Sequence, residues 1–492
     1  MLSFLLLRLL ELASAEDVFC RKEIMDLTNL TLAEQAELLR RGQCSSREIV
    51  DAHLARIERL DRRLHAFVEV YGGEARQLAE GADRARAAGL PLGPLHGLPI
   101  CLKDLCDIEG RIGTIGSRMW AARRADATSA TVERLLAAGM IPLGKTQMVE
   151  FAFGGWGSNP LMGAPWNPWD SACHRVPGGS SSGTAVAVAA GLAPAGIGSD
   201  TGGSVRIPSA FNGLVGLKVT YGRISLHGTG LLSWTLDSIG PLAHSVEDCA
   251  HLLRALAAPD ARDPATLAQP PLDLPAEFAV DGLHHLRIAL PDRAQLPPFM
   301  HPAVIEAWTG AARALEKLGA EIMPTRLPDW YFELSRQAGT IIASEAFALH
   351  RNWIEDMTQP IGEAVRGRVL NARNFVPGEY AETLRTMAER RRTFSEWFRR
   401  FDAILLPTVA LPAPPLDKID EASPVPGYFT RPVNYLGLSA LALPAGLHEG
   451  LPLSIQIIGK PFAERQILEI GKAYQDESGF NKLRPDLAAL AT

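Results

Sequence analysis

Residues 176–218 read VPGGSSSGTAVAVAAGLAPAGIGSDTGGSVRIPSAFNGLVGLK, and this stretch decides the fold. A turn rich in serine and glycine leads into a run of alanine and valine, whose small side chains let a helix pack closely on a sheet. A short apolar segment then delivers Asp200 to a second glycine turn, which carries Ser204. The pattern predicts a compact turn, helix, strand and turn that place two serine-bearing turns at neighbouring ends.

Ser204 follows two glycines, as an exposed nucleophile would, but no histidine lies within twenty residues of it. Gly-Gly-Ser is common in ordinary loops, so the turn by itself indicates no chemistry. Lys103 supplies a candidate base, because it follows the apolar run LPICL at 98–102. Burial at the end of such a strand disfavours the ammonium form and lowers its pKa, and a neutral lysine amine is a competent general base.

Short apolar runs around this stretch alternate with helical or glycine-rich segments; they are LPICL, MIPLG, LAPAGIG and LVGLKV. Such alternation predicts an α/β domain with a largely buried sheet. We expect residues 25–492 to form this domain, with a mainly helical excursion at about 302–400. Strand-like segments after residue 400 need partners in the sheet, which favours one unit. Residues 1–24 are expected to form a helical N-terminal extension.

The composition is that of an ordinary soluble protein, with 47% hydrophobic and 21% charged residues and a formal charge of -6. This balance favours neither nucleic acid nor an anionic membrane as a partner. The six cysteines show no C-x-x-C spacing, which is typical of reduced thiols in the cytoplasm and argues against a structural zinc site. No segment approaches the ~20 apolar residues of a transmembrane helix.

Two local patterns mimic known motifs. GMIPLGKT at 139–146 matches the phosphate-binding pattern G-x-x-x-x-G-K-[ST], but the apolar strand lies inside the motif and a helix precedes it. GSSSG at 179–183 matches G-x-S-x-G with Ser181 as the nucleophile, but the residues before it are polar and include a proline. We therefore interpret neither as a functional motif.

Three separated segments together resemble the amidase signature hydrolases: GLPICLKD, RVPGGSSSG and GSDTGGSVRIPSAFNGLVGLKVTYGRIS. The resemblance extends from about Asp26 to Pro485 and implies the amidase signature fold, a single large α/β/α domain with a mixed central sheet covered by helices. It also implies a Ser-cisSer-Lys triad, in which Lys103 is the base, Ser180 the bridging serine after a cis peptide bond, and Ser204 the nucleophile. The reaction implied is acyl transfer through a serine ester, without a metal or an organic cofactor.

The resemblance assigns further roles around the triad. The backbone N–H groups that it implies as the oxyanion hole belong to Thr201, Gly202, Gly203 and Ser204. The residues that it implies as structural support are Gly179, Asp200 and Arg206.

Two members of this family are candidates for the function. The segment LKVTYGRISLHGTGLLSWTLDSIGPL is close to the glutaminase subunit of tRNA-dependent amidotransferases, in which an acidic residue is expected shortly before an F-T-x-P segment. This chain has the uncharged Gly427 at that place, in PVPGYFTRPVN. The residues expected at the substrate pocket are Phe153, Gly154, Trp156 and Met162, which would favour an apolar substrate.

We therefore expect a stand-alone amidase that cleaves the C–N bond of small apolar or aromatic neutral amides, with esters and carbamates as related substrates. Its partner would be the small-molecule amide alone, without nucleic acid or membrane, and the protein would be a monomer or a homodimer. The alternative is a glutaminase subunit of a tRNA-dependent amidotransferase complex.

Overall fold

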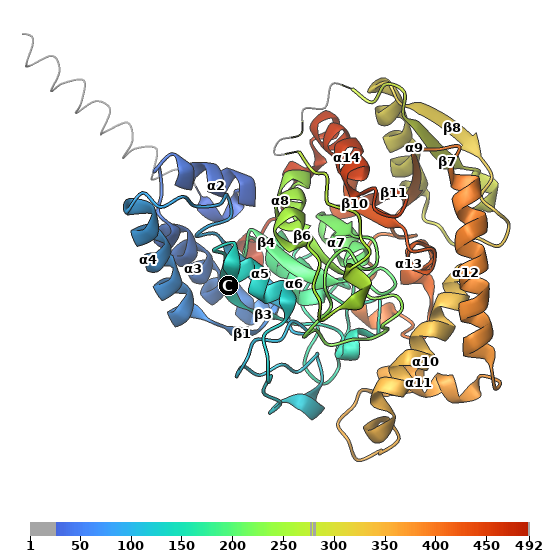
Figure 1. The fold of residues 1–492 in the computed structure, drawn as a ribbon, viewed down its shortest axis with the longest axis horizontal. Coiled ribbons are helices and arrows are strands. Elements are labelled where there is room, and N and C mark those ends of the chain that lie inside the picture. The colour runs from blue at the N-terminus through green and yellow to red at the C-terminus, as the bar shows by residue number, and fades with distance from the viewer. Residues whose placement is uncertain (1–25, 276–277, 279–281, 491–492) are drawn as a thin grey trace, which may run out of the picture.

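The structure of the protein is a computed structural model that describes residues 26–275, 278 and 282–490. This part of the chain contains one mixed sheet of 11 strands, and the strand order across the sheet is β1-β3-β2-β4-β6-β5-β10-β11-β9-β7-β8. Helices pack against the sheet along its length (Figure 1). The single α/β domain with a helix-covered mixed sheet is thus as predicted, and the expected N-terminal extension at 1–24 lies outside the described residues.

The strands and helices have the following bounds. The strands are β1 Phe67–Val70, β2 Pro99–Lys103, β3 Ile141–Thr146, β4 Ala195–Ser199, β5 Val215–Lys218, β6 Ile239–Ala243, β7 Arg287–Pro291, β8 Glu321–Thr325, β9 Ala403–Pro407, β10 Ser439–His448 and β11 Leu451–Gly459. The α-helices are α2 Leu32–Arg40, α3 Ser46–Leu64, α4 Gly72–Ala87, α5 Ala130–Ala137, α6 Ser182–Ala189, α7 Arg206–Asn212, α8 Val246–Leu256, α9 Pro302–Lys317, α10 Leu334–Ile354, α11 Glu363–Leu370, α12 Glu379–Phe398, α13 Arg431–Tyr435 and α14 Glu464–Ser478.

The central strands β2 and β4 are parallel neighbours, with Cys101 opposite Gly196 and Leu102 opposite Ile197. Every residue of both strands is buried. Because the carboxyl ends of parallel neighbours lie at the same edge of a sheet, the last residue of β2 and the turn after β4 meet there. The sheet therefore brings two segments about a hundred residues apart in sequence to one place.

Helix α6 is the alanine and valine run of the opening stretch, and all of its residues are buried. It contacts β2, β3, β4 and β6. A Cβ atom built at Gly183 in its first turn would lie 2.3 Å from the Ala66 carbonyl oxygen and 2.5 Å from the Gln147 nitrogen. Small residues therefore let this helix approach the sheet closely, which fixes the serine turn at its N-terminal end.

The segment 302–400 comprises α9, α10, α11 and α12 with one strand, β8. Strand β8 pairs in parallel with β7, and β7 pairs in parallel with β9. The later strands β10 and β11 return to the middle of the sheet. The excursion is therefore joined to the same sheet, and helices α10 and α11 pack together at the lower right of Figure 1.

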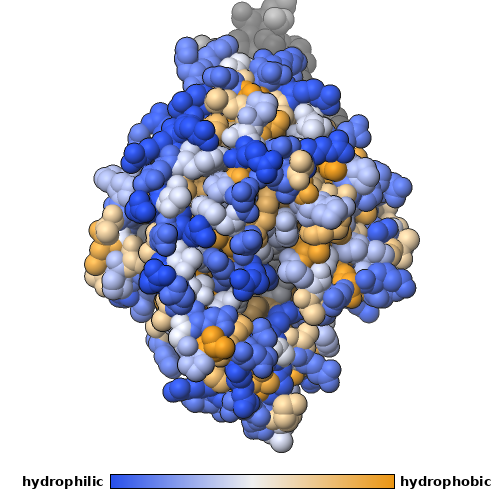
Figure 2. Space-filling view, turned by 90° about the vertical axis from the view of Figure 1, so that its right-hand side faces the viewer, coloured by the Kyte–Doolittle hydropathy of each residue, from blue (hydrophilic) through white to orange (hydrophobic). Residues whose placement is uncertain are grey.

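Helix α12 carries the arginine-rich run of the sequence on one side of the molecule. The side chains of Arg385 and Arg392 are 68% and 70% exposed, and each pairs with a glutamate on the same helix. Figure 2 shows this side as mostly hydrophilic, with apolar residues in small separate patches. These two arginines lie on a solvated helix face, whereas Arg391 turns inward and donates to the Tyr435 carbonyl oxygen at 2.8 Å. Within 26–275, 278 and 282–490, none of the helices combines the length and the apolar character that a membrane span needs.

Candidate active site

The end of β2 places Lys103 in the interior, where its side chain is fully buried. Its Nζ donates to Ser180 Oγ at 2.7 Å and to Ser199 Oγ at 2.8 Å. Burial is the main reason that the pKa of Lys103 falls from its usual 10.5 to about 7. A substantial fraction of the amine is therefore neutral near pH 7 and able to accept a proton.

Ser180 lies in the turn before α6, and the peptide bond between Gly179 and Ser180 is cis. A Cβ atom at Gly179 would lie 2.6 Å from the Gly154 carbonyl oxygen, so only glycine fits this close backbone approach. The N–H of Ser181 donates to the Ser204 carbonyl oxygen at 3.3 Å. This bond joins the two serine-bearing turns, which the sequence predicted to be neighbours.

The turn between β4 and α7 presents Ser204, which is 7% exposed and lines a cavity. The Asp200 carboxylate accepts from the N–H of Gly203 at 2.8 Å and from that of Val205 at 3.2 Å. Among the described residues, the N–H groups of Thr201, Gly202 and Ser204 have no hydrogen-bond acceptor. Three of the four N–H groups implied as an oxyanion hole are therefore open, and that of Gly203 is already bonded.

Arg206 holds this turn to the second half of the chain. Its fully buried guanidinium pairs with Asp200 at 3.0 Å, and the pair holds the pKa of Asp200 well below its usual range against the opposing effect of burial. It also donates to Gln456 Oε1 at 2.8 Å and to Asn434 Oδ1 at 2.7 Å. A buried ion pair with most of its hydrogen-bonding groups satisfied fixes geometry, and loss of either partner is costly.

A cavity of about 640 Å³ opens above Ser204. It is lined by three of the four residues expected at the pocket, Phe153, Gly154 and Trp156. The prediction of Met162 in the pocket is wrong: its sulfur lies 3.8 Å from Thr114 Oγ1, and its carbonyl oxygen accepts from His65 and Gln147. The chain turns at Asn159, whose Oδ1 accepts from the Met162 N–H.

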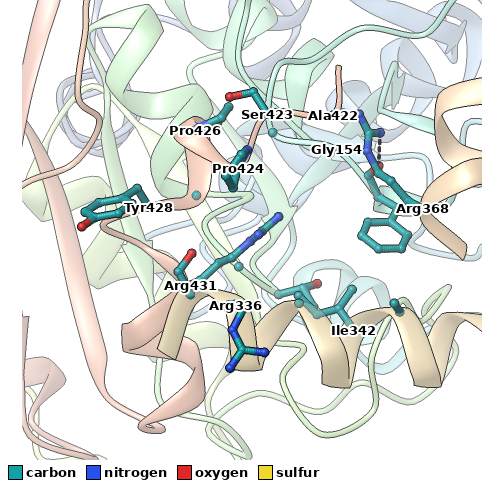
Figure 3. A pocket seen from close by; sticks show the side chains of 18 of the residues that line it. Gly154, Arg336, Ile342, Arg368, Ala422, Ser423, Pro424, Pro426, Tyr428 and Arg431 are labelled. Atoms are coloured by element: carbon teal, nitrogen blue, oxygen red, sulfur yellow. Dashed lines mark hydrogen bonds between the residues drawn. The ribbon is translucent and has the colours of Figure 1, made fainter. Parts of the chain in front are cut away.

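The cavity is also charged, which the sequence did not indicate. Its charged lining residues are Arg336, Arg368, Glu379, Glu421 and Arg431. Arg368 is engaged, because it donates to the Phe153 carbonyl oxygen at 2.7 Å and pairs with Glu421 at 2.5 Å. Figure 3 shows Arg431 extending across the middle of the pocket, with Arg368 on the far side and Arg336 on helix α10.

Two polar residues next to the serines were missed by sequence reasoning. Ser199, the last residue of β4, is the second partner of Lys103. Asp237 accepts from Thr201 Oγ1 at 2.6 Å, and burial raises its pKa to about 6. Ser199 could have been found by aligning the ends of two parallel strands, whereas Asp237 lies in a loop with no recognisable pattern.

Neither mimic of a known motif is functional in the way its pattern suggests. GKT of the phosphate-binding mimic is the end of strand β3, and Lys145 lies buried 3.6 Å from Asp104. Ser181 of the second mimic accepts from the Ser199 N–H at 3.3 Å. No cluster of three or more His, Cys, Asp or Glu side chains suited to a metal ion occurs in the part of the chain that the structure describes.

The mixed sheet and its lysine–serine site define the class of protein, an α/β enzyme with the architecture of the amidase signature hydrolases. A family model described as Amidase matches residues 48–468, so the chain belongs to the Amidase family. The A subunit of the glutamyl-tRNA(Gln) amidotransferase of Symbiobacterium thermophilum is 36% identical to it over 489 residues, which cover 93% of this chain and 99% of the relative.

Two solved structures are similar over nearly the whole chain. One is described as a vestigial protein complex that reveals the evolutionary origins of an s-triazine catabolic enzyme; its TM-score is 0.85 at 32% identity, covering 91% of this chain and 99% of that one. The other is the A subunit of the glutamyl-tRNA(Gln) amidotransferase of Thermotoga maritima, with a TM-score of 0.79 at 28% identity, covering 94% and 98%.

These relatives correct two predictions. The stand-alone amidase for small apolar amides is wrong, because the curated relatives at 35–36% identity are amidotransferase A subunits. The prediction of a small-molecule partner alone, without nucleic acid, is wrong because those relatives are named as subunits of an enzyme for a tRNA. The aromatic residues expected at the pocket indicated an apolar substrate, and the sequence did not show that arginines lie beside them. Net charge is an average over the whole surface, so it does not reveal a partner protein.

Proposed function

We propose that this chain hydrolyses the carboxamide of glutamine through Ser204 and releases ammonia as the glutaminase subunit of a tRNA-dependent amidotransferase. The observation that carries the proposal is the 2.7 Å contact between Ser180 and Lys103, which is buried and readily deprotonated. The turn that carries Ser180 is in turn hydrogen-bonded to the turn that carries Ser204. The curated relatives that match nearly the full chain support the identity of the complex. The arginines in the pocket suit a substrate with a carboxylate.

The proposed reaction begins when Ser204 Oγ attacks the carboxamide carbon. The Ser204 proton passes to Ser180 as Ser180 gives its own proton to Lys103 Nζ. The oxyanion that forms would accept from the open N–H groups of Thr201, Gly202 and Ser204, and each well-aimed donor contributes about 3 kcal/mol.

The tetrahedral intermediate then collapses by cleavage of the C–N bond. Lys103 returns the proton through Ser180 to the departing nitrogen, so that ammonia leaves and a Ser204 ester remains. Water then attacks the ester carbon and loses a proton to the same relay. The relay returns that proton to Ser204 Oγ as the ester C–O bond breaks, and glutamate leaves. Gly179, Asp200 and Arg206 hold the two turns in place without entering the chemistry.

Ammonia release and tRNA amidation test the proposal together. The purified chain is assayed with glutamine alone, and then with glutamine, the remaining subunits of a relative's amidotransferase and glutamyl-tRNA. We expect glutamate and ammonia in the complete mixture, with amidation of the tRNA, and neither product with the Ser204→Ala protein. Absence of glutamine hydrolysis from both mixtures would refute the glutaminase assignment.

A further inference from the structure

Arg431 is a cation without a counter-ion in the pocket that holds Ser204. The structure gives its guanidinium no hydrogen bond and no ion pair with any of the described residues. Burial, and after it the neighbouring Arg368, lowers its pKa to about 10, so it stays charged at neutral pH. An unpaired charge in a partly buried site is costly unless a ligand supplies its counter-ion.

Three glycines from three different segments make room for this side chain. A Cβ atom at Gly427 would lie 2.8 Å from Arg431 Nε, one at Gly202 would lie 3.0 Å from its Cγ, and one at Gly339 would lie 3.9 Å from its Nη1. Gly202 belongs to the turn that carries Ser204. The guanidinium therefore lies beside that turn, between the loop before α13 and helix α10.

Thr430 and Asn434, which lie before and after Arg431 in the sequence, are hydrogen-bonded to the turn that carries Ser204. Thr430 Oγ1 donates to the Gly202 carbonyl oxygen at 2.6 Å, and Asn434 Nδ2 donates to the Asp200 carbonyl oxygen at 3.0 Å. Arg206 also donates to the Thr430 carbonyl oxygen at 3.0 Å, which is a third hydrogen bond between the two segments. Because its backbone is held in this way, the position of Arg431 relative to Ser204 is set before any substrate arrives.

The other charges in the pocket do not neutralise Arg431. Glu421 is occupied by Arg368 and by the hydroxyl of Ser158. Glu379 is the first residue of α12 and accepts from the Val376 N–H at 3.2 Å. The charge that a ligand meets in this pocket is therefore positive at Arg431, and Gly427 beside it offers no carboxylate to an ammonium group.

We propose that Arg431 binds the carboxylate of the substrate, and that the pocket selects terminal amides of carboxylic acids through this anion without requiring an α-ammonium group. This inference rests on the proposed amide hydrolysis at Ser204 and specifies its substrate class. A planar guanidinium forms two parallel hydrogen bonds with a carboxylate, which fixes the orientation of the chain that ends in the amide. Glutamine and glutaramate, its analogue without the amino group, both meet this requirement, and pentanamide does not.

Three amides test the inference with the full chain, or with its complex if partner proteins are needed for turnover: glutamine, glutaramate and the neutral pentanamide. For Arg431→Gln we expect kcat/KM for glutaramate to fall about 10- to 100-fold, mainly through KM, because a hydrogen bond to a charged group is lost. The value for pentanamide should change less than about threefold. Arg431→Lys, which keeps the charge but not the paired donors, should recover part of the loss.

Arg385→Gln is the matched control, because it makes the same change of side chain at an exposed arginine on α12 that does not line the pocket. It should leave the selectivity between glutaramate and pentanamide unchanged. Equal losses on both amides in Arg431→Gln, or no loss on glutaramate, would overturn the inference. Hydrolysis of glutaramate but not of glutamine would refute the glutaminase proposal while supporting the role of Arg431.

Discussion

The pH dependence of turnover in a Lys103→Met protein examines the proposed base most directly. The pKa of Lys103 is lowered to about 7, so the neutral amine becomes more abundant as the pH rises through that value. In the parent protein at about pH 5, only about 1% of the Lys103 amine is neutral. Its kcat/KM at that pH should therefore be about 100-fold below the plateau reached above pH 8. Replacement by methionine should lower the plateau itself by roughly 10²- to 10⁴-fold.

The assay is ammonia release from glutamine between about pH 5 and pH 9, with circular dichroism to check the fold. Lys218→Met is a matched control: Lys218 is also buried with a pKa of about 7, but its partners among the described residues are the carbonyl oxygens of Val219 and Leu438, to which it donates. That variant, if folded, should keep the inflection near pH 7. Two results would refute Lys103 as the base. One is turnover in Lys103→Met within tenfold of the parent, and the other is an inflection near pH 7 that persists in Lys103→Met.

The lowered pKa also has a consequence for stability. Between about pH 7 and 10.5 the unfolded chain binds a proton at Lys103 that the folded chain does not. The free energy of unfolding should therefore rise with pH across this window, and the rise should be smaller in Lys103→Met. Denaturant titrations at several pH values measure the difference.

Four further substitutions follow from the surroundings of single residues. Ser199→Ala removes one of the two acceptors of the buried lysine amine, and we expect kcat to fall about tenfold at unchanged KM, as steady-state kinetics would show. In Gly203→Ala the new Cβ would lie 2.2 Å from Thr430 Oγ1 at a φ of +126°, so the free energy of unfolding should fall by about 2–4 kcal/mol. Gly310→Ala, in a helix with open space around the site, should instead be neutral or add up to about 1 kcal/mol; chemical denaturation compares the two. Asp200→Asn leaves a buried guanidinium unpaired and should cost about 3–5 kcal/mol, whereas a stability unchanged within about 1 kcal/mol would show that the pair contributes little.

Local sequence was sufficient for several elements of the fold. Thr31 and Ser45 form capping boxes at the starts of α2 and α3, and such a cap can be read from the sequence because it depends on side chains only three residues apart. The small residues of α6 likewise predicted its burial. The strand order was not predictable, because pairings such as β5 with β10 join residues more than two hundred positions apart.

The motifs around Lys103, Ser180 and Ser204 predict that these three residues share one site, because their residue types and order are specific. In the structure Lys103 contacts Ser180, and the turn that carries Ser180 is hydrogen-bonded to Ser204. What lies above that site was decided by the tertiary structure alone. Arg368 lies outside every recognised motif, and Arg431 occupies the unspecified third position of the F-T-x-P segment, to which the pattern gives no role. Their arrival at the pocket depends on how α10, α11 and α13 pack. Met162 was misplaced for the same reason: short-range sequence specifies which residues form a turn, but long-range packing determines where their side chains point.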